Sequence, residues 1–107
     1  MGYVKGGENM KALLINNYSL EEIEVENTLE ALQKAVGGYI ETVKLTQEKA
    51  VMIVNEEGML LGYGINPVAS LIAGTKIVGP ALIVGVDGEE FCNIPKGLAK
   101  RLWLQYA

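Results

Sequence analysis

The residue types that most often carry chemistry in proteins are sparse in this sequence. It contains no histidine, which is the commonest general base and metal ligand near neutral pH. Serine, cysteine and metal-dependent hydrolase sites built on imidazole are therefore excluded. The sequence predicts no catalytic residue, no metal ligand and no cofactor, and it favours a binding protein over an enzyme.

The single cysteine, Cys92, could act as a nucleophile if a lysine or a helix N-terminus activated it, since it lies shortly before Pro95. However, free cysteine is among the most buried residue types, and Cys92 alternates with Phe91 in a predicted strand. We therefore predict that Cys92 is a core residue. A lone cysteine in a small chain also favours a reducing cytoplasm over secretion.

Acidic side chains are grouped at several places along the chain. Paired carboxylates can perform acid–base chemistry or hold Mg²⁺. The groups are Glu21–Glu22, Glu24 with Glu26, Glu56–Glu57, and Asp87 with Glu89–Glu90. They fall on the solvent face of a predicted strand or at predicted hairpin tips, without calcium-loop spacing, so we interpret them as solvated surface.

A glycine-rich segment, Gly62-Tyr63-Gly64-Ile65, leads into a predicted helix start at Asn66–Pro67. Such a loop is a natural anion site, but the third glycine of a dinucleotide fingerprint is missing. Gly74-Thr75-Lys76 resembles the end of a phosphate loop, although Ala69 stands where that motif needs glycine. The alternative is that these glycines only permit tight turns.

Around these glycines the sequence concentrates amide, hydroxyl, aromatic and cationic side chains. Together they suit a small polar ligand with a base or a phosphate, and loops often carry binding residues. The predicted ligand-binding residues are Asn55, Tyr63, Asn66, Ser70, Thr75 and Lys76. Tyr63 would stack on a base, the two asparagines would contact polar edges, and Lys76 would meet phosphate.

The elements that position these residues are expected to be strands joined by turns, interrupted by short helices. Hydrophobic patterning predicts strands at 11–15, 20–25, 39–45, 50–54, 81–86 and 90–93. Met59–Leu61 is predicted to form a further hairpin with 50–54, with Gly58 in the left-handed conformation. Helices are predicted at 28–36, after Asn66–Pro67 up to Gly74, and from Pro95 onward.

Particular residues are expected to begin these helices and to pack them. Asn27 is the predicted N-cap of the first helix, with Glu30 three residues later and Leu29 among the apolar positions. Leu71 in the second helix and Trp103 in the third are expected to face the core.

This order of elements predicts an α+β fold, a mainly antiparallel sheet of hairpins with three short helices packed on it. The chain of 107 residues fits one domain. Residues 1–9 are Gly-rich and polar and are predicted to be a flexible N-terminal extension, and residues 10–107 the single α+β domain.

The net charge of −4 argues against DNA or RNA as a partner. The nine Lys and Arg residues are spread along the chain, only Arg101 is an arginine, and they do not alternate with aromatic residues. No segment approaches the roughly 20 apolar residues that a membrane span needs. Nucleic acid and membrane are therefore not expected partners.

Several sequence blocks resemble a family of roughly 100-residue domains of unknown function that phages and conjugative elements of Firmicutes carry. The blocks are Met10–Ile15, Leu29–Gln33, Val36–Glu41, Val54–Gly58 and Ile77–Val84. The resemblance covers nearly all of Met10 to Trp103 and is most specific at Val36–Glu41. It implies a mobile-element origin and no established activity, and it transfers no functional residues.

Such an origin suggests an anti-defence role in the host cytoplasm, and three hypotheses follow. The first is a homo-oligomeric sponge that sequesters a cyclic nucleotide or cyclic ADP-ribose type signal at residues 62–76. The second is an interaction module that inhibits or recruits a host protein through an apolar surface at Trp103, Leu104 and Tyr106. The third is a histidine-free, metal-dependent phosphodiesterase that uses the carboxylates.

Overall fold

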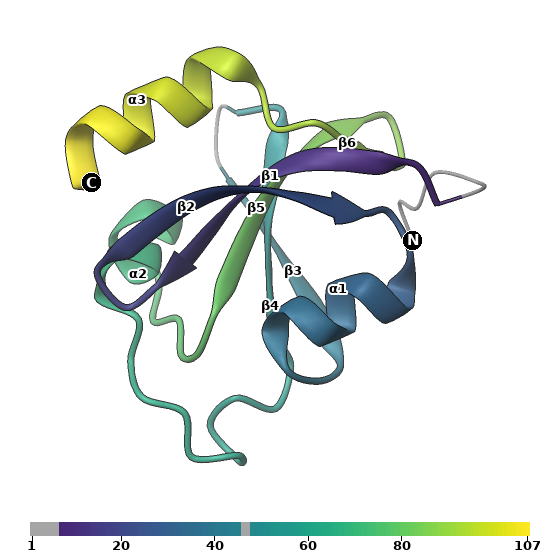
Figure 1. Cartoon of the computed structure of the whole chain (residues 1–107). Coiled ribbons are helices and arrows are strands. Elements are labelled where there is room, and N and C mark those ends of the chain that lie inside the picture. Colours follow the sequence, from purple (N-terminus) through teal and green to yellow (C-terminus); the bar gives the residue numbers. More distant parts are fainter. Residues whose placement is uncertain (1–6, 46–47) are drawn as a thin grey trace.

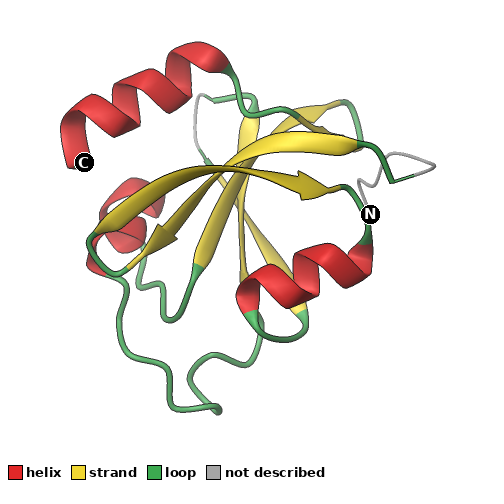
Figure 2. Cartoon of the chain, in the orientation of Figure 1, coloured by secondary structure: helices red, strands yellow, loops and turns green. Residues whose placement is uncertain are grey.

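The chain folds as an antiparallel sheet with helices on both faces (Figure 1, Figure 2). The computed structural model describes residues 7–45 and 48–107. The strands in these residues are β1 (Asn9–Asn16), β2 (Ser19–Glu26), β3 (Ile40–Lys44), β4 (Ala50–Asn55), β5 (Ala81–Asp87) and β6 (Glu90–Cys92). The helices are α1 (Leu29–Val36), α2 (Pro67–Ala73) and α3 (Lys96–Tyr106).

Pairs of strands that are consecutive in sequence form the sheet. β1 pairs with β2, β3 with β4, and β5 with β6, all antiparallel. β5 joins the pairs because it also bonds to β1 and β4. The order is β2-β1-β5-β4-β3, with β6 beside β5, so β2 and β3 are the edges. The predicted α+β class with a mainly antiparallel sheet is confirmed.

Each face of the sheet has its own core because side chains alternate along strands. On one face, α1 packs its buried Leu32 and Val36 against strand residues such as Ile53. On the other face, α2 and α3 pack against residues that include Leu13 and Ile83. The expectation that three short helices pack on the sheet is therefore confirmed as well.

The start of α1 differs from the prediction by one residue. The N-cap is Thr28, whose Oγ1 accepts a hydrogen bond from the Ala31 N–H at 3.2 Å. Asn27, the predicted cap, is buried instead, and its Nδ2 donates to the Phe91 carbonyl at 3.0 Å. Because the Asn27 side chain is bonded to β6, the next residue, Thr28, caps the helix. Leu29, expected to pack inward, is exposed.

The predicted hairpin between β4 and Met59–Leu61 is wrong. These three residues lie in consecutive turns, not in a strand. Gly58 is not among the glycines with positive φ, so it does not supply the left-handed conformation that such a hairpin would need. β4 pairs with β3 along one edge and with β5 along the other, so neither edge is left for Met59–Leu61.

Two apolar residues expected to face the core point outward. α2 packs through Val68 and Ala69, which leaves Leu71 exposed. In α3 the buried positions include Leu98 and Leu102, and Trp103 is partly exposed. One residue along a helix is a rotation of about 100°, so Leu102 and Trp103 cannot both face the sheet.

The first six residues of the predicted N-terminal extension lie outside the described residues. Its last residues take part in the fold. β1 begins at Asn9, and the Glu8 carbonyl accepts a hydrogen bond from the Asn27 N–H at 2.9 Å. β1 therefore begins one residue before residue 10, where the predicted domain starts.

Candidate functional site

The loop between β4 and α2, residues 56–66, extends away from the sheet (Figure 1). Backbone hydrogen bonds inside the loop fix its shape. The Leu61 N–H donates to the Glu57 carbonyl at 2.9 Å, and the Tyr63 N–H donates to the Gly58 carbonyl at 3.0 Å. The segment predicted to bind a ligand, residues 62–76, begins in this loop.

The segment before β5 fastens the returning end of the loop. The Asn66 N–H donates to the Ile77 carbonyl at 2.8 Å, and the Gly79 N–H donates to the Gly64 carbonyl at 3.0 Å. At the start of the loop, the Glu56 N–H donates to the Tyr39 carbonyl at 2.8 Å. Both ends of the loop are therefore bonded to the body of the protein.

Tyr63 connects the loop to two glycines of the body. A Cβ atom at Gly79 would lie 2.5 Å from Tyr63 Cδ2, and one at Gly37 would lie 2.5 Å from the Tyr63 hydroxyl oxygen. Only glycine can leave room for this half-buried ring, and both glycines have positive φ. Tyr63 therefore braces the loop, and its predicted stacking on a base would compete with this packing.

Asn66 is buried at the base of the loop and its amide is fully used. Nδ2 donates to the Ile15 carbonyl at 3.0 Å and to the Gly79 carbonyl at 2.9 Å. Oδ1 accepts from the Ala69 N–H at 3.2 Å and caps α2, as predicted from the Asn66–Pro67 pair. The amide holds β1, α2 and the segment before β5 together.

Ser70 continues the network that begins at Asn66. Its Oγ donates to the Asn66 carbonyl at 2.7 Å and accepts from the Ile77 N–H at 2.9 Å. A hydroxyl with these partners stabilises the end of the loop, and its predicted contact with a ligand stays a prediction.

Asn55 is buried at the other end of the loop. Its Nδ2 donates to the Val36 carbonyl at 3.0 Å, and its Oδ1 accepts from the Glu57 N–H at 2.7 Å. The side chain thus stabilises the C-terminal end of α1 and the first turn of the loop. As with Asn66, its donor and acceptor are engaged within the protein.

Thr75 and Lys76 are the two predicted site residues that are exposed. They line a cavity of about 330 Å³ between the loop and the outer part of β3 and β4. Asn55 also lines this cavity, whereas Tyr63, Asn66 and Ser70 do not. The structure therefore brings three of the six predicted residues to one cavity and places the other three in the supports of the loop.

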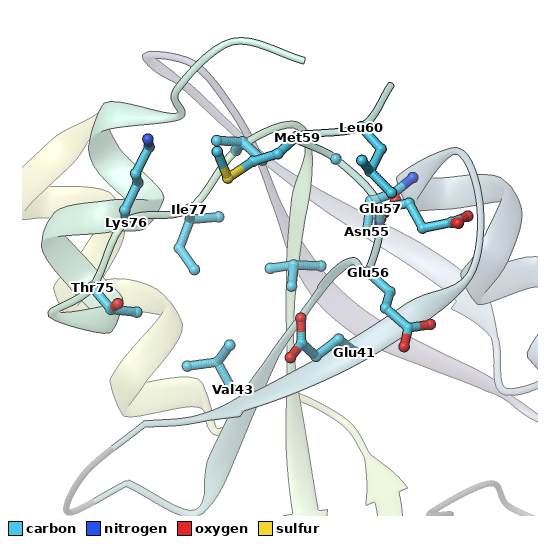
Figure 3. A pocket seen from close by; sticks show the side chains of 13 residues that line it. Glu41, Val43, Asn55, Glu56, Glu57, Met59, Leu60, Thr75, Lys76 and Ile77 are labelled. Atoms are coloured by element: carbon cyan, nitrogen blue, oxygen red, sulfur yellow. Dashed lines mark hydrogen bonds between the residues drawn. The ribbon is translucent and has the colours of Figure 1, made fainter. Parts of the chain in front are cut away.

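The rim of this cavity carries more negative than positive charge (Figure 3). Glu41, Glu56 and Glu57 lie on it, and Lys76 lies across the cavity from Glu41 and Glu56. Three carboxylates against one ammonium group disfavour a ligand with phosphates. A basic group on an apolar ligand would be favoured, because valine, isoleucine and methionine side chains also line the cavity.

Three consecutive apolar residues of the loop, Met59, Leu60 and Leu61, are exposed and are called here the apolar tip. Their exposed fractions are 68%, 84% and 54%. Met59 and Leu60 also line the mouth of the cavity (Figure 3). Sequence reasoning missed this surface because an unbroken apolar run also suits a buried strand. One sequence feature could have indicated an exposed loop: Met59–Leu61 do not alternate with polar residues, and Gly62-Tyr63-Gly64 follows them directly.

Cys92 is half-buried in β6, not fully in the core as predicted. Partial burial, and secondarily the Asp87 carboxylate, raises the pKa of its thiol. A raised pKa lowers the thiolate fraction, which opposes a nucleophilic role. Within residues 7–45 and 48–107, no three acidic or cysteine side chains lie close enough together to hold a metal ion.

Comparison with known proteins gives a family and a fold. A family model described as "Domain of unknown function (DUF3846)" matches residues 10–107. No curated protein matches the sequence. One similar solved structure is titled "Crystal structure of small RNA methyltransferase HEN1", with a TM-score of 0.64 and 15% sequence identity.

That likeness covers 94% of this chain and 16% of the methyltransferase chain. At 15% identity it shows a shared fold and nothing about activity. In the part of the chain that the structure describes, no helix has both the length and the apolar character to cross a membrane.

Proposed function

We propose that this chain, which belongs to the DUF3846 family of domains of unknown function, is a binding module that captures a partner protein. The partner would present an apolar segment that carries basic residues. The apolar tip, Met59–Leu61, would contact the apolar side chains, and the cavity beside it would receive a basic one.

The observation that carries this proposal is the exposure of three consecutive large apolar residues on a loop with a fixed shape. Scattered single apolar residues on a surface are ordinary, but adjacent ones often mark an interaction site. A pre-shaped loop also binds at a smaller cost in conformational entropy than a mobile one. Buried asparagines and Tyr63 provide that shape.

The charge around the tip indicates the chemistry of the partner. Glu41, Glu56 and Glu57 surround the cavity that Met59 and Leu60 border. A lysine or arginine of the partner could reach these carboxylates while its neighbours cover the tip. An acidic partner or a phosphate-bearing ligand would meet repulsion at the same place.

This proposal develops the second hypothesis from the sequence, with the contact surface moved from the end of α3 to the loop. The inhibition or recruitment of a host protein, the host cytoplasm and the mobile-element origin remain parts of the proposal. A nucleotide sponge at residues 62–76 stays a prediction. It receives less support, because the amides of Asn55 and Asn66 have internal partners.

Two synthetic amphipathic peptides test the proposal. They share leucines at the same positions and carry either lysine or glutamate at the remaining ones. We expect the lysine peptide to bind about tenfold more tightly in fluorescence anisotropy. Replacing Met59 and Leu60 together by serine should weaken that binding by about tenfold, as for residues at the centre of an interface.

The matched control is Leu104→Ser, which removes a similarly exposed leucine from α3. It should leave the affinity unchanged, and an equal loss there would return the contact surface to the end of α3. Absence of binding by the lysine peptide, or equal binding of both peptides, would contradict the proposal. Concentration-dependent dimerisation that Leu60→Ser abolishes would show that the tip serves a second copy instead.

A further inference from the structure

One face of α3 carries two lysines and the tryptophan. Lys96, Lys100 and Trp103 are spaced i, i+4 and i+7, which places them on one side of a helix. The neighbouring strand β2 carries Glu22 and Glu24 on a common face, because alternate residues of a strand share a face. The structure thus sets basic groups of a helix beside acidic groups of an edge strand.

These side chains line one groove. Lys96, Lys100, Glu22 and Glu24 border a hollow of about 480 Å³. Glu22 also borders a smaller hollow of about 250 Å³ with Trp103, so the two hollows adjoin at Glu22. The larger hollow by itself falls in the size range of small-molecule sites.

A third lysine reaches the groove from the next strand. Lys11 of β1 lines the larger hollow and lies opposite Glu24 in the β1–β2 register. Three ammonium groups and two carboxylates leave a net charge of +1, in a protein whose overall charge is −4. The ion pair found among the described residues joins Arg101 to Glu48 and includes none of these three lysines.

The floor of the groove is apolar. Ile94 and Ala99, both buried, lie between the charged walls. A ligand that fits must therefore combine an anionic group, hydrogen-bond donors for the carboxylates and a flat apolar part. Inorganic phosphate supplies only the anionic group. A nucleoside supplies only the hydrogen-bond donors and the flat apolar part.

We propose that this groove binds a nucleoside monophosphate. Its phosphate would lie among Lys11, Lys96 and Lys100, as charge-assisted hydrogen bonds require. Sugar hydroxyls or exocyclic amino groups would donate to Glu22 and Glu24. The base would stack on Trp103, which is 44% exposed. The sequence predicted a nucleotide-like ligand at residues 62–76, and this site lies at a different place on the molecule.

The chain contains one tryptophan, so its fluorescence reports directly on this site. We expect adenosine 5′-monophosphate to quench Trp103 in a saturable way. Adenosine should bind about tenfold more weakly because it lacks the phosphate. Inorganic phosphate should compete with the nucleotide without quenching by itself.

Paired variants separate this site from general charge attraction. Lys96→Ala with Lys100→Ala should weaken nucleotide binding by about tenfold. Lys34→Ala with Lys44→Ala removes the same charge from α1 and β3, outside the groove, and should have little effect. Circular dichroism of each variant checks that it is folded.

Three outcomes would overturn the proposal. They are the absence of saturable quenching, equal affinity for adenosine and its monophosphate, and equal weakening by both pairs of lysine variants. The groove shares none of its lining residues with the cavity beside the apolar tip. A negative result here therefore leaves the proposed capture of a partner protein unaffected.

Discussion

On the β3 side of the sheet the protein exposes an apolar tip beside three carboxylates, whereas on the β2 side it exposes three lysines, two carboxylates and a tryptophan. The first surface belongs to a loop and the second to a helix and an edge strand. The loop needs buried amides and a tyrosine to keep its shape, while the helix positions its side chains by spacing alone.

This difference shows how a chain without histidine can offer two kinds of binding surface. The loop surface would bind through apolar contact and select against negative charge. The groove would bind through positive charge and add an apolar stacking surface. Because the two lie at opposite edges, variants can disturb one and leave the other intact.

The largest expected effect comes from the amide that supports the loop. Asn66→Ala removes two donated hydrogen bonds and one accepted one in a buried place. We expect it to lower the free energy of unfolding by about 3 kcal/mol, measured by urea denaturation.

Asn93→Ala is the matching change beside the groove. It removes one exposed bond from the Lys11 N–H, at 2.7 Å, and should cost about 1 kcal/mol. Equal losses in the two variants would mean that the loop does not depend on its buried amide in the way described.

A second comparison tests whether Tyr63 braces the loop. Gly79→Ala places a methyl group against the Tyr63 ring at φ +77°, and we expect a loss of about 2 kcal/mol in thermal or urea unfolding. Gly88→Ala in the β5–β6 turn has a similar φ of +65° and nothing within 4 Å of the added atom. It should cost about 1 kcal/mol, from backbone strain alone.

The difference between these two variants reports the contact with Tyr63. In a Tyr63→Ala background, Gly79→Ala should cost no more than Gly88→Ala. A difference that persists without the ring would show that Tyr63 does not brace the loop.

The exposed residues of the tip should contribute little to folding. Met59→Ser and Leu60→Ser are expected to change the free energy of unfolding by no more than about 0.5 kcal/mol each, like most surface substitutions. Urea denaturation of these variants and of Leu104→Ser makes the comparison. A loss of several times that size would place the tip in the core and remove the basis of the proposed function.

The smallest effect concerns the thiol of β6. Because the pKa of Cys92 is raised in the folded protein, less thiolate is present at any given pH than in the unfolded chain. Alkylation by iodoacetamide near pH 8 should be slower in the folded protein than in denaturant, with its rate rising at higher pH. Faster alkylation of the folded protein would instead mark Cys92 as an activated nucleophile.

Much of the fold could be predicted because its elements carry local patterns. Asn66–Pro67 and Gly74 bound α2 as expected, since capping chemistry acts within a few residues. The Asp87–Gly88 pair likewise predicts a hairpin from local preference, and the structure has a turn at Gly88–Glu89 between the paired residues Asp87 and Glu90. These features need no knowledge of distant parts of the chain.

The sequence predictions were wrong where contacts between distant parts of the chain determine the local structure. Asn27 does not cap α1 because its amide bonds to β6. Met59–Leu61 is not a strand because β3 and β5 already occupy both sides of β4. Neither fact is visible in a local window of sequence.

The candidate site divides in the same way. The sequence predicts Asn55, Tyr63 and Asn66 as ligand-binding residues. In the structure they contact Val36, Gly37 and Ile15, which are far away in the sequence. The groove was missed because its walls come from residues 11–24 and 94–103. Helical spacing predicts the common face of Lys96, Lys100 and Trp103, but not the strand beside it.

The most direct test of the central claim is a methyl chemical-shift titration of the protein with the lysine amphipathic peptide. Proposed capture by the apolar tip predicts that the methyl signals of Met59, Leu60 and Leu61 shift first and most, followed by those lining the adjoining cavity. Signals of Ile94 and Ala99 in the groove should stay in place. Shifts that begin at the groove, or that leave the tip unchanged at saturation, would contradict the account.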